Sequence, residues 1–70
     1  MLHDVYIESS FIGKFVAPTY NDAAYMAMSQ WGSNKAYMIE VFYPKNGVMA
    51  RKRFYHCEIK NNSFTYSKVV

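Results

Sequence analysis

The chain has 70 residues, of which 51% are hydrophobic and 19% aromatic, and its formal net charge is +3 at pH 7. A chain of this length forms a single domain, residues 1–70, whose small core needs reinforcement from bulky side chains. The modest positive charge falls short of the charge density of a DNA-coating protein, and a single cysteine, Cys57, excludes an internal disulfide.

The sequence also lacks the marks of several other classes of protein. Asp4, Glu8 and Lys14 interrupt the first 17 residues, so no signal-peptide core is present, and no apolar run is long enough for a membrane span. No Cys/His pairs have the spacing of a structural zinc site. We therefore expect a soluble, cytoplasmic protein without a metal or a cofactor.

The first 17 residues predict a β-hairpin. Leu2 to Glu8 is rich in β-formers, and Phe11 to Ala17 alternates after Ser9-Ser10. Alternation predicts that one face of this hairpin points into the core and leaves Tyr6, Glu8 and Lys14 outside. The inward set is Val5, Ile7, Phe11, Phe15 and Ala17.

A helix follows the break at Pro18. Thr19 is a natural N-cap, Asp22 adds an acidic group to the first turn, and Gly32 suits the C′ position. A helical wheel predicts a stripe that packs on a sheet, formed by Tyr20, Ala24, Ala27, Met28 and Trp31.

The stretch from Lys35 to Tyr55 predicts a second hairpin around Asn46-Gly47, a dipeptide that suits a type I′ turn. A two-residue loop opposes Phe42 with Arg51, Glu40 with Arg53 and Met38 with Tyr55. A four-residue loop, Pro44 to Gly47, shifts the register by two and keeps the same faces. Ile39, Val41, Tyr43 and Phe54 then form an apolar face against the helix, with Lys52 as its one charged member.

The end of the chain predicts one more strand. Continued alternation past Tyr55 points Ile59 away from the core, so a bulge near Cys57, or an end to the strand there, is needed. Lys60 to Ser63 is a turn, and Phe64 to Val69 is a last strand that pairs back on Arg51 to Tyr55. The predicted fold is α+β, with the order ββαβββ and a mainly antiparallel sheet that carries one helix on one face.

Few residues suit catalysis. His56 and Cys57 are neighbours on a strand, so their side chains point to opposite faces and cannot form a nucleophile-base pair. His3 is the other candidate, and the chain has no phosphate loop, no HExxH and no paired-carboxylate motif. The sequence predicts that the protein is not an enzyme.

The candidate binding surface is the basic aromatic strand from Ala50 to His56. Its residues share one sheet face with side chains of the partner strand, and such a face can stack bases and hold phosphates. The plainer interpretation is that the acidic and aromatic partners pair with the arginines on a solvated face. A third interpretation is a protein interface, because Arg, Tyr and Met are enriched there. The candidate binding residues are Arg51, Arg53, Tyr55, Met38, Phe42 and Lys14.

The stretch FVAPTYNDAAYMA, followed by a helix, an Asn-Gly hairpin and a terminal strand, is similar to the layout of small accessory proteins of phages and mobile elements, including some anti-CRISPR proteins. That resemblance fixes no functional residue. It implies an inhibitor or modulator that occludes a host nucleic-acid-handling protein or nucleoprotein complex. Direct single-stranded nucleic-acid binding through the basic aromatic face is the alternative, a homodimer stays open, and no membrane partner is expected.

Overall fold

The computed structural model describes the whole chain, residues 1–70, as one helix and six strands. The α+β architecture predicted from the sequence is confirmed. In chain order the elements are β1 (Leu2–Ile7), β2 (Ser10–Val16), α1 (Tyr20–Trp31), β3 (Lys35–Lys45), β4 (Val48–Lys60), β5 (Ser63–Thr65) and β6 (Lys68–Val69).

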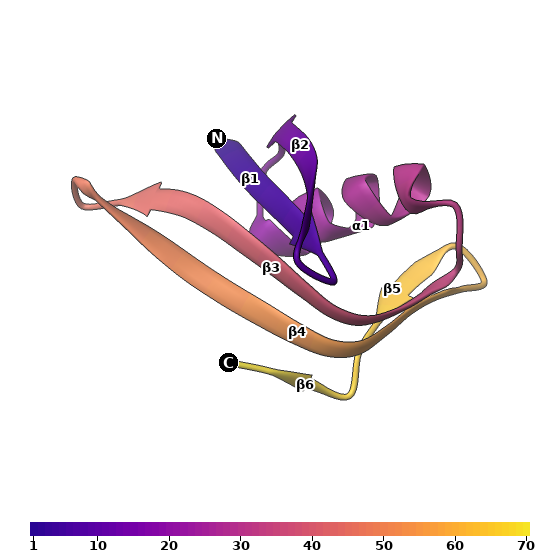
Figure 1. Cartoon of the computed structure of the whole chain (residues 1–70). Coiled ribbons are helices and arrows are strands. Elements are labelled where there is room, and N and C mark those ends of the chain that lie inside the picture. The colour runs from indigo at the N-terminus through magenta and orange to yellow at the C-terminus, as the bar shows by residue number, and fades with distance from the viewer.

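The strands form one antiparallel sheet in the order β2-β1-β3-β4-β5, with β6 paired to β4. The helix lies on one side of this sheet, and the long β3-β4 hairpin extends beyond β1 and β2 (Figure 1). The opposite side has no covering layer, and we call it the open face. One side of the sheet therefore packs against the helix to form the core, and the other side faces solvent.

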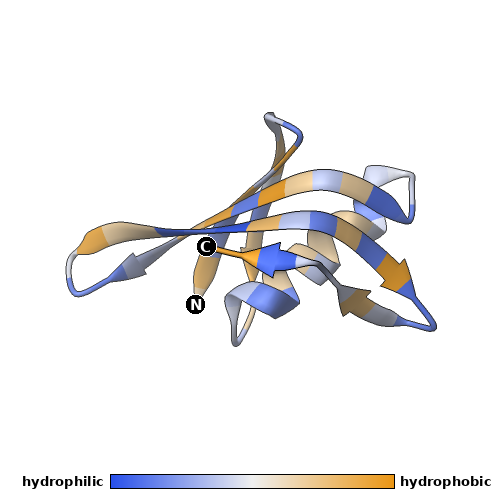
Figure 2. Ribbon diagram, turned by 90° about the horizontal axis from the view of Figure 1, so that it is seen from below, coloured by the Kyte–Doolittle hydropathy of each residue, from blue (hydrophilic) through white to orange (hydrophobic).

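The β3-β4 hairpin has the register predicted for a two-residue loop. Lys45 pairs with Val48, Phe42 with Arg51 and Glu40 with Arg53. Asn46 and Gly47 have φ angles of 52° and 81°, which is the left-handed conformation that a type I′ turn needs. Figure 2 shows hydrophobic and hydrophilic stretches along the long strands of the sheet.

Two further hairpins turn in the same way without a glycine. Glu8 and Ser9 have φ angles of 49° and 70° between β1 and β2, and Asn61 and Asn62 have φ angles of 52° and 61° between β4 and β5. Asparagine tolerates this conformation, whereas glutamate rarely adopts it. Tertiary contacts hold Glu8, because its amide donates to the Met38 carbonyl and its Oε2 accepts from the Tyr37 amide at 2.9 Å.

The prediction that Phe11 points into the core is wrong. Val5 pairs with Gly13 but Tyr6 pairs with Phe11, so Ile12 is an extra residue in a β-bulge. The bulge reverses the alternation of β2. Ile12 therefore packs against the core, and Phe11 lies on the open face with its ring 5.2 Å from that of Tyr6.

The phase change predicted near Cys57 is confirmed, but neither the bulge nor the strand end expected there occurs, because β4 continues to Lys60 in unbroken register with β3. His56 has a φ angle of 52° inside β4, and after it Cys57 is buried and Ile59 packs against the core. The predicted last strand is divided into two: β5 pairs with Glu58 to Lys60, and β6 pairs with Phe54 and Tyr55. Tyr66 lies between them, and its ring is 4.9 Å from Phe54.

The helix begins and ends where the sequence predicts. The Thr19 hydroxyl accepts a hydrogen bond from the Asp22 amide at 3.2 Å, and Gly32 adopts a left-handed conformation at the C-terminus. Alanine supplies five of the thirteen buried apolar residues of the core, so the helix can lie close to the sheet. Phe54 is the largest fully buried side chain, and rings of Tyr20, Phe64 and Tyr66 surround it.

Candidate functional site

Two cross-strand rows carry most of the predicted binding residues on the open face. The first row runs from Lys14 on β2 through Asp4 and Phe42 to Arg51 on β4. Lys14 Nζ lies 2.9 Å and 3.1 Å from the two carboxylate oxygens of Asp4. The positive charge of Lys14 is thus compensated within the protein.

The second row runs from Phe11 through Tyr6 and Glu40 to Arg53. Arg53 donates from Nε and Nη2 to Glu40 Oε2, at 3.1 Å and 2.8 Å. The Arg51 Nη1 atom lies 3.7 Å from the same oxygen. A single carboxylate therefore draws both arginines inward along the sheet.

Tyr55 extends this cluster toward β6. Its hydroxyl oxygen accepts a hydrogen bond from Arg53 Nη1 at 3.2 Å, and Lys68 Nζ lies 5.6 Å from its ring centroid. The hydrogen bond to Tyr55, and after it the hydrogen bonds to Glu40, raise the pKa of Arg53 above its ordinary value. Met38 is the half-buried partner of Tyr55 on β3. The structure thus brings all six predicted binding residues to the open face.

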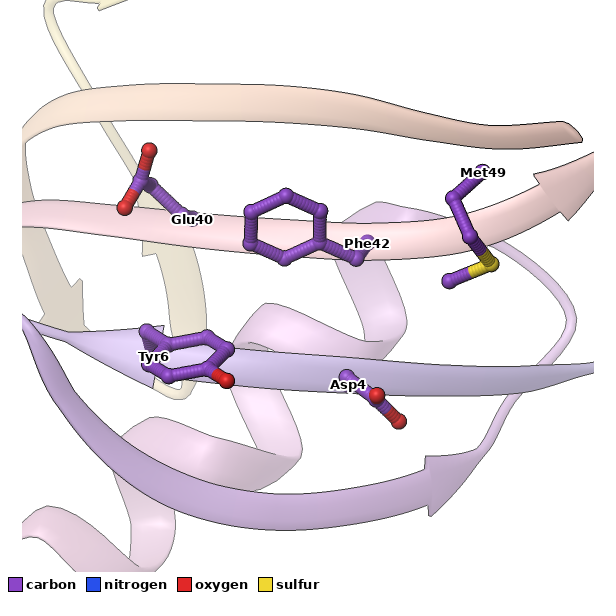
Figure 3. A pocket seen from close by; sticks show the side chains of 5 residues that line it. All are labelled: Asp4, Tyr6, Glu40, Phe42 and Met49. Carbon is purple, nitrogen blue, oxygen red and sulfur yellow. The ribbon is translucent and has the colours of Figure 1, made fainter.

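A shallow hollow of about 290 Å³ lies between the two rows, as Figure 3 shows. Two carboxylates and two aromatic rings surround it, and the Tyr6 and Phe42 rings meet edge to face at 5.7 Å. The lining residues are Asp4, Tyr6, Glu40, Phe42 and Met49. Four of them, Asp4, Tyr6, Glu40 and Met49, were not among the predicted binding residues. The pairing of β1 with β3 places the first two there, and no local sequence signal specifies that pairing.

Exposed apolar side chains continue from this hollow toward the hairpin tip. Leu2 and Val16 are cross-strand partners with 46% and 72% of their surface exposed, and Met49 is 59% exposed beside Pro44. Phe11 is 52% exposed at the other side of the hollow. A chain this small has no second layer to cover these groups, so water meets them directly.

The charges of the open face are largely balanced. Lys14, Arg51 and Arg53 meet Asp4 and Glu40, so three cations face two carboxylates. A groove that follows a phosphate backbone has cations free for the phosphates. Here the carboxylates that hold the cations also line the hollow, and they would repel a phosphate.

The three candidate catalytic residues, Cys57, His56 and His3, have different surroundings. Cys57 is buried, and desolvation raises the pKa of its thiol to about 11, although a hydrogen bond from the Ile39 backbone lowers it. The thiol therefore stays protonated at neutral pH, where a nucleophile would need the thiolate. His56 is exposed and its ring meets that of Tyr37 edge to face at 5.2 Å. His3 is buried and lies on the helix side of the sheet.

No group of three or more acidic, histidine or cysteine side chains has the arrangement of a metal site. The helix α1 lacks the length and the apolar character needed to cross a membrane. Comparison with protein-family models, with curated proteins and with solved structures finds no match to this chain.

Proposed function

We propose that this chain is a small, non-enzymatic binding protein whose open face docks on a partner protein. The observation that carries this proposal is the combination of exposed apolar residues with charges that are already paired. Aromatic, methionine and arginine side chains are typical of the centre of protein interfaces, while free cations are typical of nucleic-acid grooves. Phe11, Tyr6, Phe42, Met49 and Arg53 provide the first kind of surface.

The finer proposal concerns the partner. The similarity in layout to phage and mobile-element accessory proteins supports a host nucleic-acid-handling protein, or a nucleoprotein complex, as the target. Binding of a compact chain over a functional surface would inhibit or modulate this target by occlusion, without chemistry. The mixed charges of the open face suit a target surface that offers both an acidic and a basic group beside an apolar centre.

A capture experiment tests both the proposed docking through the open face and the proposed kind of partner. The tagged chain is incubated with host lysate, with and without nuclease, beside the open-face double variant Phe11→Ser, Met49→Lys. Met26→Ser serves as the matched control, because Met26 is 40% exposed on the helix and lies away from the sheet. We expect one protein in near-stoichiometric amount, retained after nuclease, lost with the double variant and kept by the control.

Direct binding of single-stranded nucleic acid is the second candidate function, and the cluster of Arg53, Tyr55 and Lys68 favours it. In that case the capture of protein would depend on nucleic acid and disappear with nuclease. The isolated chain would then bind a mixed oligonucleotide with a salt slope of about 0.7 per phosphate contact. Tyr55→Ala would weaken this binding by roughly 1 to 3 kcal/mol through loss of base stacking.

A further inference from the structure

A second hollow, of about 360 Å³, lies on the helix side of the sheet, between the start of β1, the end of β3 and the N-terminus of α1. Its strand residues His3, Tyr43 and Lys45 belong to the side that α1 covers, and Pro44 lies at its border with the open face. The residues that line it include His3, Pro18, Thr19, Tyr20, Tyr43 and Lys45.

His3 is the unusual group in this hollow. Only 1% of its surface is exposed, and its Nδ1 atom has no hydrogen-bond partner. Buried polar groups in proteins nearly always have such a partner, so an orphaned one needs an explanation. The neighbouring ring is Tyr43, whose centroid is 5.8 Å from that of the imidazole and whose plane is inclined to it by 42°. The Nδ1 atom is itself sealed from solvent, so a hydrogen-bonding group in the hollow would satisfy it once the imidazole turned toward the hollow.

The walls of the hollow are flat and mainly apolar. Tyr20 and Tyr43 stack with their centroids 5.5 Å apart and their planes inclined by 29°. Pro18 and Pro44 also line the hollow. Flat apolar walls favour a ligand with a planar ring, because such a ring can lie against them and remove a large apolar surface from water.

The electrostatics of this end of the molecule favour an anion. Lys45 lines the hollow, Lys52 Nζ lies 5.5 Å from the Tyr20 ring centroid, and neither lysine takes part in a salt bridge. The N-terminus of α1 adds a partial positive charge, since the first amides of a helix have no helical partner. Asp22 is the opposing charge. Its carboxylate is exposed and accepts a hydrogen bond from the Thr19 hydroxyl at 2.9 Å.

We propose that this hollow binds a small anionic ligand that carries a planar ring. The ring lies against Tyr43 and Tyr20, and the anionic group points toward Lys45 and the imidazole of His3. The site goes beyond the proposed function, since it uses no residue of the open face.

The test is a nuclear magnetic resonance titration of the isotope-labelled chain with adenosine 5′-monophosphate. Separate titrations with adenosine and with inorganic phosphate supply the ring alone and the anion alone. We expect saturable shifts at His3, Tyr20 and Tyr43, with each half of the probe binding more weakly than the whole. Lys45→Gln should weaken binding about fivefold, because it removes one exposed charge. Asp22→Asn should strengthen binding, because it removes the opposing charge.

Lys14→Gln on the open face is the matched control, and it should leave the affinity unchanged. Lys45 is exposed, so its variant keeps the fold, and a thermal melt verifies this. Dissociation constants above about 1 mM for all three probes would overturn the site. Equal affinity for adenosine and its monophosphate, or an unchanged affinity of Lys45→Gln, would overturn the anionic part. Failure here leaves the capture experiment untouched, because neither residue changed in that experiment, Phe11 or Met49, lines this hollow.

Discussion

Arg53 donates two hydrogen bonds to one carboxylate oxygen of Glu40, at 3.1 Å from Nε and 2.8 Å from Nη2. The residues face each other across β3 and β4, in the register that the Asn46-Gly47 turn imposes. This ion pair decides how much positive charge the open face offers to a ligand.

Glu40→Gln tests that conclusion. The substitution keeps the shape of the side chain but releases Arg51 and Arg53 from a common anion, so affinity for a single-stranded oligonucleotide should rise. The salt slope should increase by about 0.7 for each arginine that gains a phosphate contact. Fluorescence anisotropy at several salt concentrations measures both quantities. If parent and variant bind equally, the ion pair does not limit nucleic-acid binding.

Phe54 should matter more for stability than Trp31. Phe54 is fully buried among three aromatic rings, whereas Trp31 is partly buried at the end of α1. We expect Phe54→Ala to lower the free energy of unfolding by about 3 to 5 kcal/mol. Trp31→Ala should cost about 3 kcal/mol, in the lower part of that range. Urea denaturation measures both, and Phe54→Leu replaces the alanine variant if the latter does not fold. A larger effect at Trp31 would contradict this arrangement of the core.

The left-handed turns predict opposite changes in stability when a glycine is removed from one turn and introduced into another. Gly47→Ala should destabilise the chain by about 1 kcal/mol, because its φ of 81° is unfavourable for alanine. No neighbouring atom would contact the new Cβ, so backbone strain is the whole effect. Ser9→Gly should stabilise it by roughly 0.5 kcal/mol, because Ser9 already adopts a φ of 70°. Thermal melts of the two variants suffice. Effects of the same sign would show that turn conformation is not what these positions contribute.

Cys57 predicts a loss of stability in alkali. Its pKa rises from 9.0 to about 11 on folding, so the unfolded chain releases the thiol proton first. The stabilisation is complete below about pH 9 and is lost as the pH rises through about 11, by up to about 2 kcal/mol. Cys57→Ala removes this contribution and leaves every other ionisable side chain in place. Denaturation at about pH 8 and about pH 10 should give a smaller decrease for the variant. Parallel decreases would show that the thiol is not responsible.

Local signals in the sequence determine much of this fold. Thr19 and Gly32 mark the ends of the helix, because capping is a property of a few adjacent residues. Asn46-Gly47 fixes the register of β3 and β4, and with it the positions of Glu40, Arg51 and Arg53. Even the phase change at His56 follows from the sequence, since Ile59 would otherwise point to water.

The tertiary structure alone decides the rest. The bulge at Ile12 turns Phe11 outward. Gly13 beside it is a residue type that often marks a bulge, but which neighbour becomes the extra residue depends on the pairing of the two strands and on the core. The pairing of β1 with β3 brings Asp4 and Tyr6 beside Phe42 and Glu40. It also places His3 beside Tyr43 under the start of the helix. Contacts between residues distant in the chain depend on how whole faces of the sheet and helix pack. Short-range sequence patterns do not specify which strands become neighbours.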